Sequence, residues 1–167
     1  MLKPLIQKII VAINGSEQSL HAAMYAILMA KQYKCSLKVV YVVDTAALKF
    51  LNMSRFFLKD ESQKYEDNLV HDGEKYLEQV VTLAKVKGVK VETQLRKGSP
   101  WAEIVRAADE FAADFILLGG KEHQNVSVTS DVAHDRASST NMEIVGNAAC
   151  NVLVVRQKDI EKLFKIG

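Results

Sequence analysis

The chain has 167 residues, of which 49% are hydrophobic and 25% are charged, and its formal net charge is +2. This composition is typical of one globular domain, which at this length buries roughly 70% of its unfolded surface without a metal or disulfide staple. Basic and acidic residues are interleaved, which argues against a nucleic-acid partner, and no apolar run reaches the ~18 residues of a membrane span. We therefore expect a single domain over residues 1–167, with a peripheral tail at 157–167 and no membrane partner.

The N-terminal segment and the cysteines bear on localisation. Met1 to Ile9 contains Lys3 and Lys8 but no long apolar core and no small-residue cleavage site, so we predict no signal peptide. Cys35 and Cys150 fit neither a CxxC motif nor a disulfide framework. Reduced cysteines that serve as small buried residues indicate a cytoplasmic protein.

The first predicted strand covers Lys8 to Ile13, because Ile9 to Ile13 is a continuous run of apolar and mostly β-branched residues. Runs of this kind are typical of strands that a parallel sheet buries on both faces. The run ends in the turn Asn14-Gly15-Ser16, where Ser16 or Ser19 is placed to cap a helix that extends to about Lys34.

A second strand is predicted over Leu37 to Val43, followed directly by Asp44. Residues 45–60 are apolar but poorly periodic, and we expect a loop with a short helical turn over the mouth of the sheet. A long helix is predicted from about Glu61 to Lys87, where Gly88 is a suitable C-terminal stop. The expected buried stripe of this helix consists of Tyr65, Leu69, Tyr76, Val80, Leu83 and Ala84.

The third strand is predicted over Val89 to Arg96, where apolar and polar residues alternate as they do near the edge of a sheet. The following Gly98-Ser99-Pro100 predicts a helix start, with serine as the cap and proline in the first turn. A fourth strand, Phe115 to Leu118, ends at Gly119-Gly120.

The segment 121–140 is predominantly polar and predicts a long loop, and loops of this length are usually functional or disordered. A short helix from about Ser139 to Asn147 and a last strand, Val152 to Val155, follow it. No metal site is predicted, because the acidic and histidine residues of the loop match no standard ligand spacing. These residues are His123, Asp131, His134 and Asp135.

Strands and helices therefore alternate along the chain, which predicts a parallel sheet with right-handed crossovers and helices on both faces. Such sheets bind ligands at the carboxyl ends of their strands. Small and polar residues gather at four of these ends: Asn14-Gly15-Ser16, Asp44, Gly98-Ser99 and Gly119-Gly120. Any one turn needs small residues for its own geometry, so it is their joint occurrence that indicates a ligand site.

Five segments occur in a recognisable order: Ile10–Ser19, Val39–Asp44, Gly98–Ile104, Ala113–Gly119 and Ala148–Arg156. Together they resemble the universal stress protein family along nearly the whole chain. The resemblance implies a three-layer, nucleotide-binding-like α/β fold with a five-stranded parallel sheet in the order 3-2-1-4-5. It also implies a homodimer joined through the last strand, here Val152, Leu153, Val154 and Val155, and an unpaired apolar edge strand favours such pairing.

Some members of this family bind ATP through an acidic residue at the end of the first strand and a stretch G-x2-G-x9-G-(S/T) after the fourth. Glycines in such a stretch let backbone N–H groups approach phosphate oxygens. The present chain has Asn14 at the acidic position, Glu122 at the second glycine, and Ser138-Ser139 at the final pair. It keeps Gly119 as the first glycine, the Ser139 hydroxyl, and Val42 as the residue whose backbone would read adenine.

Two functions follow from these departures. The first is a non-enzymatic stress-response protein with a degenerate nucleotide pocket that acts through dimerisation and an unidentified protein partner. The alternative is a sensor of ATP or another adenine nucleotide, or a slow ATPase, in which the loop 120–140 supplies replacement donors and Lys121 offsets phosphate charge. No catalytic residue is predicted, since Ser16 lacks a Gly-x-Ser-x-Gly frame. The predicted pocket residues are Ala12, Asn14, Gly15, Ser16, Val42, Asp44, Gly98, Gly119, Gly120, Ser138, Ser139 and Thr140.

Overall fold

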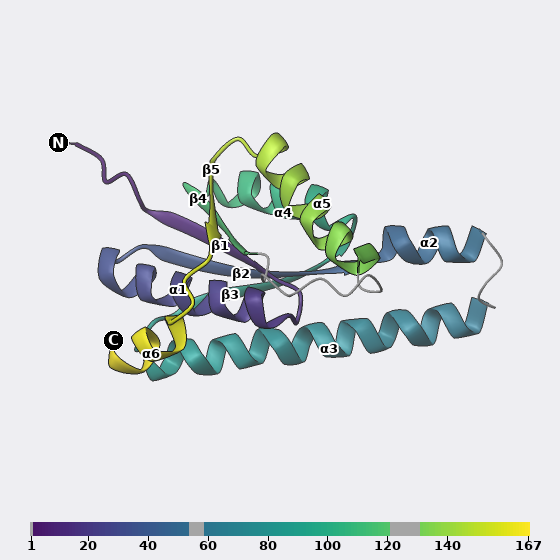
Figure 1. Ribbon diagram of the computed structural model, residues 1–167, viewed down its shortest axis with the longest axis horizontal. Coiled ribbons are helices and arrows are strands. Elements are labelled where there is room, and N and C mark those ends of the chain that lie inside the picture. Colours follow the sequence, from purple (N-terminus) through teal and green to yellow (C-terminus); the bar gives the residue numbers. More distant parts are fainter. Residues whose placement is uncertain (1, 54–58, 121–130) are drawn as a thin grey trace.

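Five parallel strands form one sheet in the order β3-β2-β1-β4-β5, as the resemblance implied (Figure 1). The structure is a computed structural model that describes residues 2–53, 59–120 and 131–167, and it places side chains at 2–50, 61–120 and 139–167. The strands are β1 (Lys8–Ile13), β2 (Ser36–Asp44), β3 (Val91–Gly98), β4 (Phe115–Gly119) and β5 (Asn151–Val155). The helices are α1 (Glu17–Tyr33), α2 (Thr45–Met53), α3 (Lys59–Val86), α4 (Pro100–Phe111), α5 (Asp131–Asn147) and α6 (Ile160–Ile166).

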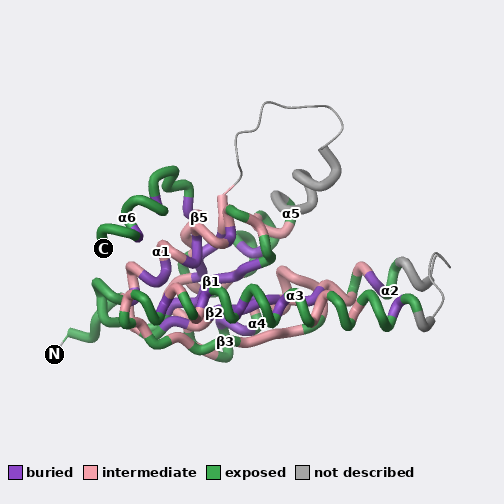
Figure 2. Tube along the Cα trace, turned by 90° about the horizontal axis from the view of Figure 1, so that it is seen from below, coloured by how far each residue is buried: buried purple, intermediate pink, exposed green. Residues whose placement is uncertain are grey.

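The helices cover both faces of the sheet and give three layers. Helices α1, α3 and α6 lie on one face, and α4 and α5 lie on the other (Figure 1). Each face of the sheet packs a hydrophobic core against its helices, and alternate residues of β1 point to the two cores. Ile9 and Val11 belong to the core on the side of α1, α3 and α6, and Ile10 and Ala12 belong to the core on the side of α4 and α5. This explains why the strand is apolar throughout, and Figure 2 shows the buried positions concentrated in the sheet and the helix faces turned toward it.

The start of β1 is tied to the start of β4 through Asp114. Its carboxylate accepts hydrogen bonds from the backbone N–H groups of Gln7 at 2.8 Å and Lys8 at 3.0 Å. These bonds hold the pKa of Asp114 below its usual range. The two hydrogen bonds of Asp114 lie at the amino ends of the strands, opposite the edge where a ligand site is expected.

The expectation over residues 45–60, a loop with a short helical turn, is corrected at 45–53, where α2 begins directly after β2, while residues 54–58 lie outside the described residues. The carboxylate of Asp44 accepts a hydrogen bond at 3.0 Å from the backbone N–H of Ala47 and so caps this helix. Leu48 is only 5% exposed and anchors it. The cap can be recognised in the sequence, because Asp44 and Ala47 are only three residues apart. The helix itself is harder to recognise, because it has too few turns to show a clear apolar period.

The expected buried stripe of α3 is only partly correct. Val80 and Ala84 are buried, but Tyr65 and Tyr76 are 47% and 36% exposed, and Leu77 takes part in the core instead. The N-terminal half of α3, which includes Tyr65, extends beyond the sheet beside α2 (Figure 1), whereas Tyr76 lies in the C-terminal half and packs against Gly15. A helical period in the sequence therefore does not reveal which part of a long helix reaches the core.

The long loop expected at 121–140 is also corrected, since α5 begins at Asp131 and includes the second half of that segment. Among the described side chains of α5, Ile144 is the one that is buried. A helix that offers so little apolar surface gives a weak periodic signal. Residues 121–130, with Lys121, Glu122 and His123, lie outside the described residues.

Helix α6 connects the C-terminal tail to the body of the fold. Ile160 is 1% exposed and Phe164 is 6% exposed, and the latter belongs to the core between α1, α3 and the sheet. Across the helices that the structure describes, none combines the length and the apolar character needed to cross a membrane.

Candidate functional site

A cavity of about 780 Å³ lies at the carboxyl ends of the strands, between the start of α1, the start of α4 and the C-terminal half of α5. This volume and position are typical of ligand sites in parallel α/β sheets. The predicted pocket residues that line it are Ala12, Asn14, Ser16, Val42, Asp44, Gly119, Gly120 and Thr140. The topology therefore brings the ends of β1, β2 and β4 around one space.

Four predicted residues are placed differently. Gly15 lies beneath the ring of Tyr76, and Gly98 lies against Glu103, so neither belongs to the lining of the cavity. Ser139 is exposed and outside the lining as well. Ser138 lies in α5, but its side chain is outside the described part of the chain. The hydroxyl that α5 brings to the cavity is that of Thr140, one residue further along.

The turn after β1 is held by hydrogen bonds of its own side chains. Asn14 Oδ1 accepts from the backbone N–H of Ser16 at 3.0 Å, and Ser16 Oγ accepts from the N–H of Ser19 at 3.1 Å. Ser19 Oγ in turn accepts from the N–H of Asn14 at 3.2 Å. In the described structure Asn14 Nδ2 donates no hydrogen bond, so the end of β1 offers a ligand a donor where an acidic residue would offer acceptors.

Gly119, which ends β4, and Gly120, which follows it, are required by close packing. A Cβ atom on Gly119 would lie 2.7 Å from the backbone carbon of Gln18 and 2.8 Å from the backbone nitrogen of Ser19. A Cβ atom on Gly120 would lie 2.7 Å from the carbonyl oxygen of Val155. Asn141 Nδ2 also donates to the carbonyl of Gly119 at 3.0 Å. The presence of Gly119 is therefore explained by the approach of α1 to β4, whether or not a phosphate binds there.

Arg156 is the charged residue of the described lining that the sequence did not predict as a site residue. It follows β5 directly and lines the cavity, with its Cγ lying 3.0 Å from the position of a Cβ on Gly120. Among the described residues it has no acidic partner, in contrast to Arg96, which binds Glu103 and Glu110. A guanidinium with all its donors available is well suited to a phosphate. Its place directly after the last strand, at the carboxyl edge, was the signal available in the sequence.

The charges around the cavity are unevenly distributed. Among the described residues of the lining, Arg156 carries a positive charge and Asp44 a negative one. One oxygen of Asp44 already caps α2 through Ala47, so the other is the acceptor that remains for a ligand. The cavity can thus provide donors and a cation near β5, and a carboxylate acceptor near β2.

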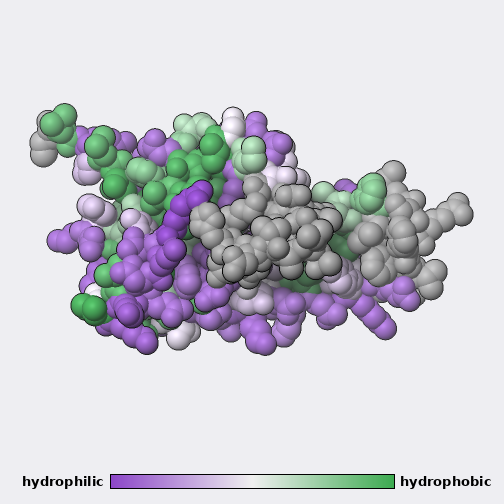
Figure 3. All heavy atoms as spheres, in the orientation of Figure 1, coloured by the Kyte–Doolittle hydropathy of each residue, from purple (hydrophilic) through white to green (hydrophobic). Residues whose placement is uncertain are grey.

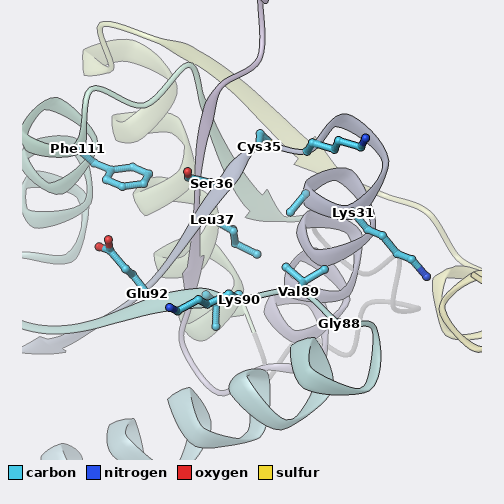
Figure 4. Close-up of a pocket in the computed structure, with 12 residues that line it drawn as sticks. Lys31, Cys35, Ser36, Leu37, Gly88, Val89, Lys90, Glu92 and Phe111 are labelled. Atoms are coloured by element: carbon cyan, nitrogen blue, oxygen red, sulfur yellow. The ribbon is translucent and has the colours of Figure 1, made fainter.

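A second cavity, of about 520 Å³, lies at the amino ends of β2 and β3 (Figure 4). In Figure 4 the Lys31 side chain points away from the space, and it donates to the carbonyl of Gly167 at 2.8 Å. Burial raises the pKa of the Cys35 thiol, which makes it a poor nucleophile. Lys34, Lys90 and Glu92 also line this cavity, which lies at the edge of the sheet opposite to the one where parallel α/β sheets bind ligands.

Comparisons with known proteins agree on one family. The family model described as the universal stress protein family matches residues 5–156. The chain is 31% identical over 155 residues to a universal stress protein of Methanocaldococcus jannaschii, an alignment that covers 92% of this chain and 84% of the relative.

Solved structures share the fold at low sequence identity. A universal stress protein family member from Burkholderia pseudomallei superposes with a TM-score of 0.70 at 21% identity, over 93% of this chain and all of that one. A universal stress protein from Archaeoglobus fulgidus in complex with dAMP gives a TM-score of 0.61 at 17% identity, over 92% and 100% of the two chains. A universal stress protein in complex with cAMP gives 0.58 at 18% identity, over 90% and 96%.

Proposed function

The chain belongs to the universal stress protein family, and from that premise we propose that it is a non-enzymatic, cytoplasmic stress-response protein that binds an adenosine monophosphate in the cavity at the carboxyl edge of its sheet. The observation that carries the proposal is Arg156, which lines a cavity of about 780 Å³ and has no acidic partner among the residues that the structure describes. Nucleotide binding would in turn control the contact with a protein partner. Two fold neighbours that were solved with cAMP and dAMP support this ligand class.

The base would lie toward β2 and the phosphate toward β5. Val42 lines the cavity near the end of β2, and Asp44 offers its remaining carboxylate oxygen to an exocyclic amine or a ribose hydroxyl. Asn14 Nδ2 supplies a donor to a ring nitrogen or a ribose oxygen. Arg156 is placed to bind a phosphate through two N–H groups.

A single phosphate fits this site better than three. The second family glycine is replaced by Glu122, and a carboxylate near a phosphate chain opposes its charge. Within the described lining, Arg156 supplies the positive charge that can offset the negative charge of a ligand. One positive charge is adequate for a monophosphate but offsets little of the charge of a triphosphate. The pocket is thus degenerate toward ATP and is proposed to retain the smaller nucleotide.

We expect AMP to bind with a micromolar dissociation constant and ATP with Mg²⁺ to bind at least about tenfold more weakly. Arg156→Gln is expected to weaken AMP binding by about tenfold to a hundredfold, because a charged hydrogen bond contributes about 1.5–3 kcal/mol. Isothermal titration of AMP, cAMP and ATP against the purified protein measures these differences.

Lys158→Gln is the matched control, since it removes a nearby exposed positive charge that does not line the cavity. Its AMP affinity should equal that of the unmodified protein. Tighter binding of ATP than of AMP would favour the alternative, an ATP sensor or slow ATPase that uses donors from residues 120–140. The hydroxyl residues that this alternative would use are Ser138, Ser139 and Thr140: Thr140 lines the cavity, Ser139 lies outside the lining, and the side chain of Ser138 is outside the described part of the chain.

We also propose that two copies pair through β5. This strand forms one edge of the sheet, and Val152, Leu153 and Val154 remain half-buried there. Figure 3 shows apolar side chains gathered over this region and along the N-terminal segment, where Leu2 and Leu5 are 100% and 90% exposed. An unpaired apolar edge of this kind is stabilised by pairing with a second edge.

Sedimentation at micromolar concentration is expected to give a species of twice the 18.6 kDa chain mass. Association should weaken on dilution without loss of helical circular dichroism, since each chain has its own cores. A protein that sediments as a monomer across the micromolar range would contradict this pairing.

A further inference from the structure

Three side chains with metal-ligating atoms converge where the C-terminal helix meets the start of α1. Glu17 and His21 lie one turn apart on α1, and Glu161 comes from α6, 140 residues beyond His21. His21 Nε2 lies 3.2 Å from Glu161 Oε1 and 3.8 Å from Glu17 Oε1. We propose that this group binds one divalent ion of the zinc class, and that the ion joins the C-terminal helix to the nucleotide-binding end of α1.

The spacing of the three atoms fits a small tetrahedral ion. Ligands held at about 2.0–2.2 Å from a tetrahedral centre lie about 3.3–3.6 Å from one another. The two distances from His21 Nε2, 3.2 and 3.8 Å, bracket that range, and all three ligand atoms lie within 4.8 Å of one another. Small rotations of the exposed carboxylates would therefore complete three positions, and water would occupy the fourth.

The donor set also indicates the class of ion. One imidazole nitrogen with two carboxylate oxygens suits zinc and the neighbouring transition ions better than calcium or magnesium, which prefer oxygen ligands alone. Glu17 and Glu161 each lie in the first turn of their helices. The positive end of a helix favours the ionised carboxylate that a metal requires.

The three residues are positioned by contacts of the fold. Glu17 and His21 share a face of α1 because residues four apart are neighbours on a helix. Glu161 follows Ile160, which is 1% exposed, and Phe164, four residues after Ile160 on the same face of α6, is 6% exposed. Lys87 Nζ also lies 4.8 Å from the centre of the Phe164 ring. Because Ile160 and Phe164 already hold α6 against the body of the fold, the binding of an ion would require little further ordering of the chain.

An ordinary hydrogen bond between His21 and Glu161 is the competing explanation of the 3.2 Å contact. That explanation predicts that zinc has no specific effect on this corner of the molecule. The proposed ion would instead restrain both helices, and Gln18 and Ser19, which lie between Glu17 and His21 in the sequence, line the cavity at the carboxyl ends of the strands. The two explanations therefore differ in what zinc does to α6.

The test is isothermal titration of the purified full-length chain with Zn²⁺, with Co²⁺ absorption as a spectroscopic probe of coordination. His21→Gln and Glu161→Gln are each expected to weaken zinc binding roughly tenfold or more, since even groups that only support a metal ligand contribute 10- to 100-fold. His71→Gln is the matched control, because this exposed histidine of α3 lies outside the cluster. Its zinc affinity should equal that of the unmodified protein.

Hydrogen exchange over residues 160–166 supplies a readout that does not depend on total metal bound. Zinc should slow this exchange in the unmodified chain and in His71→Gln, and should leave it unchanged in His21→Gln. Circular dichroism checks that the surface substitutions preserve the fold. Unchanged zinc affinity in both His21→Gln and Glu161→Gln would overturn the proposal, as would the absence of submillimolar zinc binding by the unmodified chain.

Discussion

Gly15→Ala is expected to lower the free energy of unfolding by about 3 kcal/mol, because two costs add at this position. The backbone φ of Gly15 is +85°, in the left-handed region that a side chain disfavours. A Cβ atom there would also lie 2.6 Å from Cε2 and 2.8 Å from Cζ of the Tyr76 ring. Urea unfolding followed by circular dichroism measures the loss.

One side of the Tyr76 ring is held by its neighbour Tyr41. It stacks on Tyr41 with ring centroids 6.1 Å apart, and Tyr41 is itself buried against Gly73 of α3. A Cβ atom on Gly73 would lie only 2.6 Å from the Tyr41 ring. The turn after β1, the two rings and α3 therefore form one packed unit, although they come from distant parts of the sequence.

Gly88→Ala is the control for Gly15→Ala. Its φ is +70°, but no atom lies within 4 Å of the position of its Cβ. The free energy of unfolding of Gly88→Ala should therefore fall only by the cost of placing alanine in the left-handed region, about 1 kcal/mol. Equal losses for the two variants would mean that the contact with Tyr76 contributes nothing, and the steric part of the argument would be wrong.

Gly119→Ala is expected to lower the free energy of unfolding by about 2 kcal/mol, the usual range for overpacking a close contact. The added methyl group would meet the backbone of Gln18 and Ser19, which cannot rotate away as a side chain can. Either the start of α1 or the end of β4 must shift. Since both border the cavity, the AMP affinity proposed above should fall in the same variant.

Gly146→Ala separates this packing effect from the mere addition of a methyl group. Gly146 also lines the cavity, but no atom lies within 4 Å of the position of its Cβ. Because it lies inside α5, alanine should be neutral or should stabilise the fold by up to about 1 kcal/mol. A comparable loss of stability in the two variants would contradict the close approach of α1 to β4.

Local patterns predicted most of the sheet. The apolar run of β1 and the proline after Ser99 identified a strand and a helix start close to where they are found. Such features depend on a few neighbouring residues, and these carry their own conformational preferences. The prediction failed at α2 and at the start of α5, where short or polar helices offer little periodic signal.

The candidate site was predictable in part for the same reason. Asn14, Asp44 and Gly119 are strand-end residues, and parallel topology alone brings such ends to one edge. Arg156 and Thr140 needed the structure, because their approach to the cavity depends on where β5 and α5 lie. The sequence predicts Gly15 as a pocket residue, but its surroundings show a packing role against Tyr76.

The sequence by itself determined the alternation of strands and helices, the family, and the edge of the sheet at which a ligand would bind. These follow from patterns that repeat within a few residues and from the handedness of the crossover connections. Only the tertiary structure decided which side chains meet: Arg156 beside Gly120, Tyr76 over Gly15, and His21 between Glu17 and Glu161. Contacts of this kind join residues up to 140 positions apart, and no local pattern records them because they depend on how whole helices are seated on the sheet.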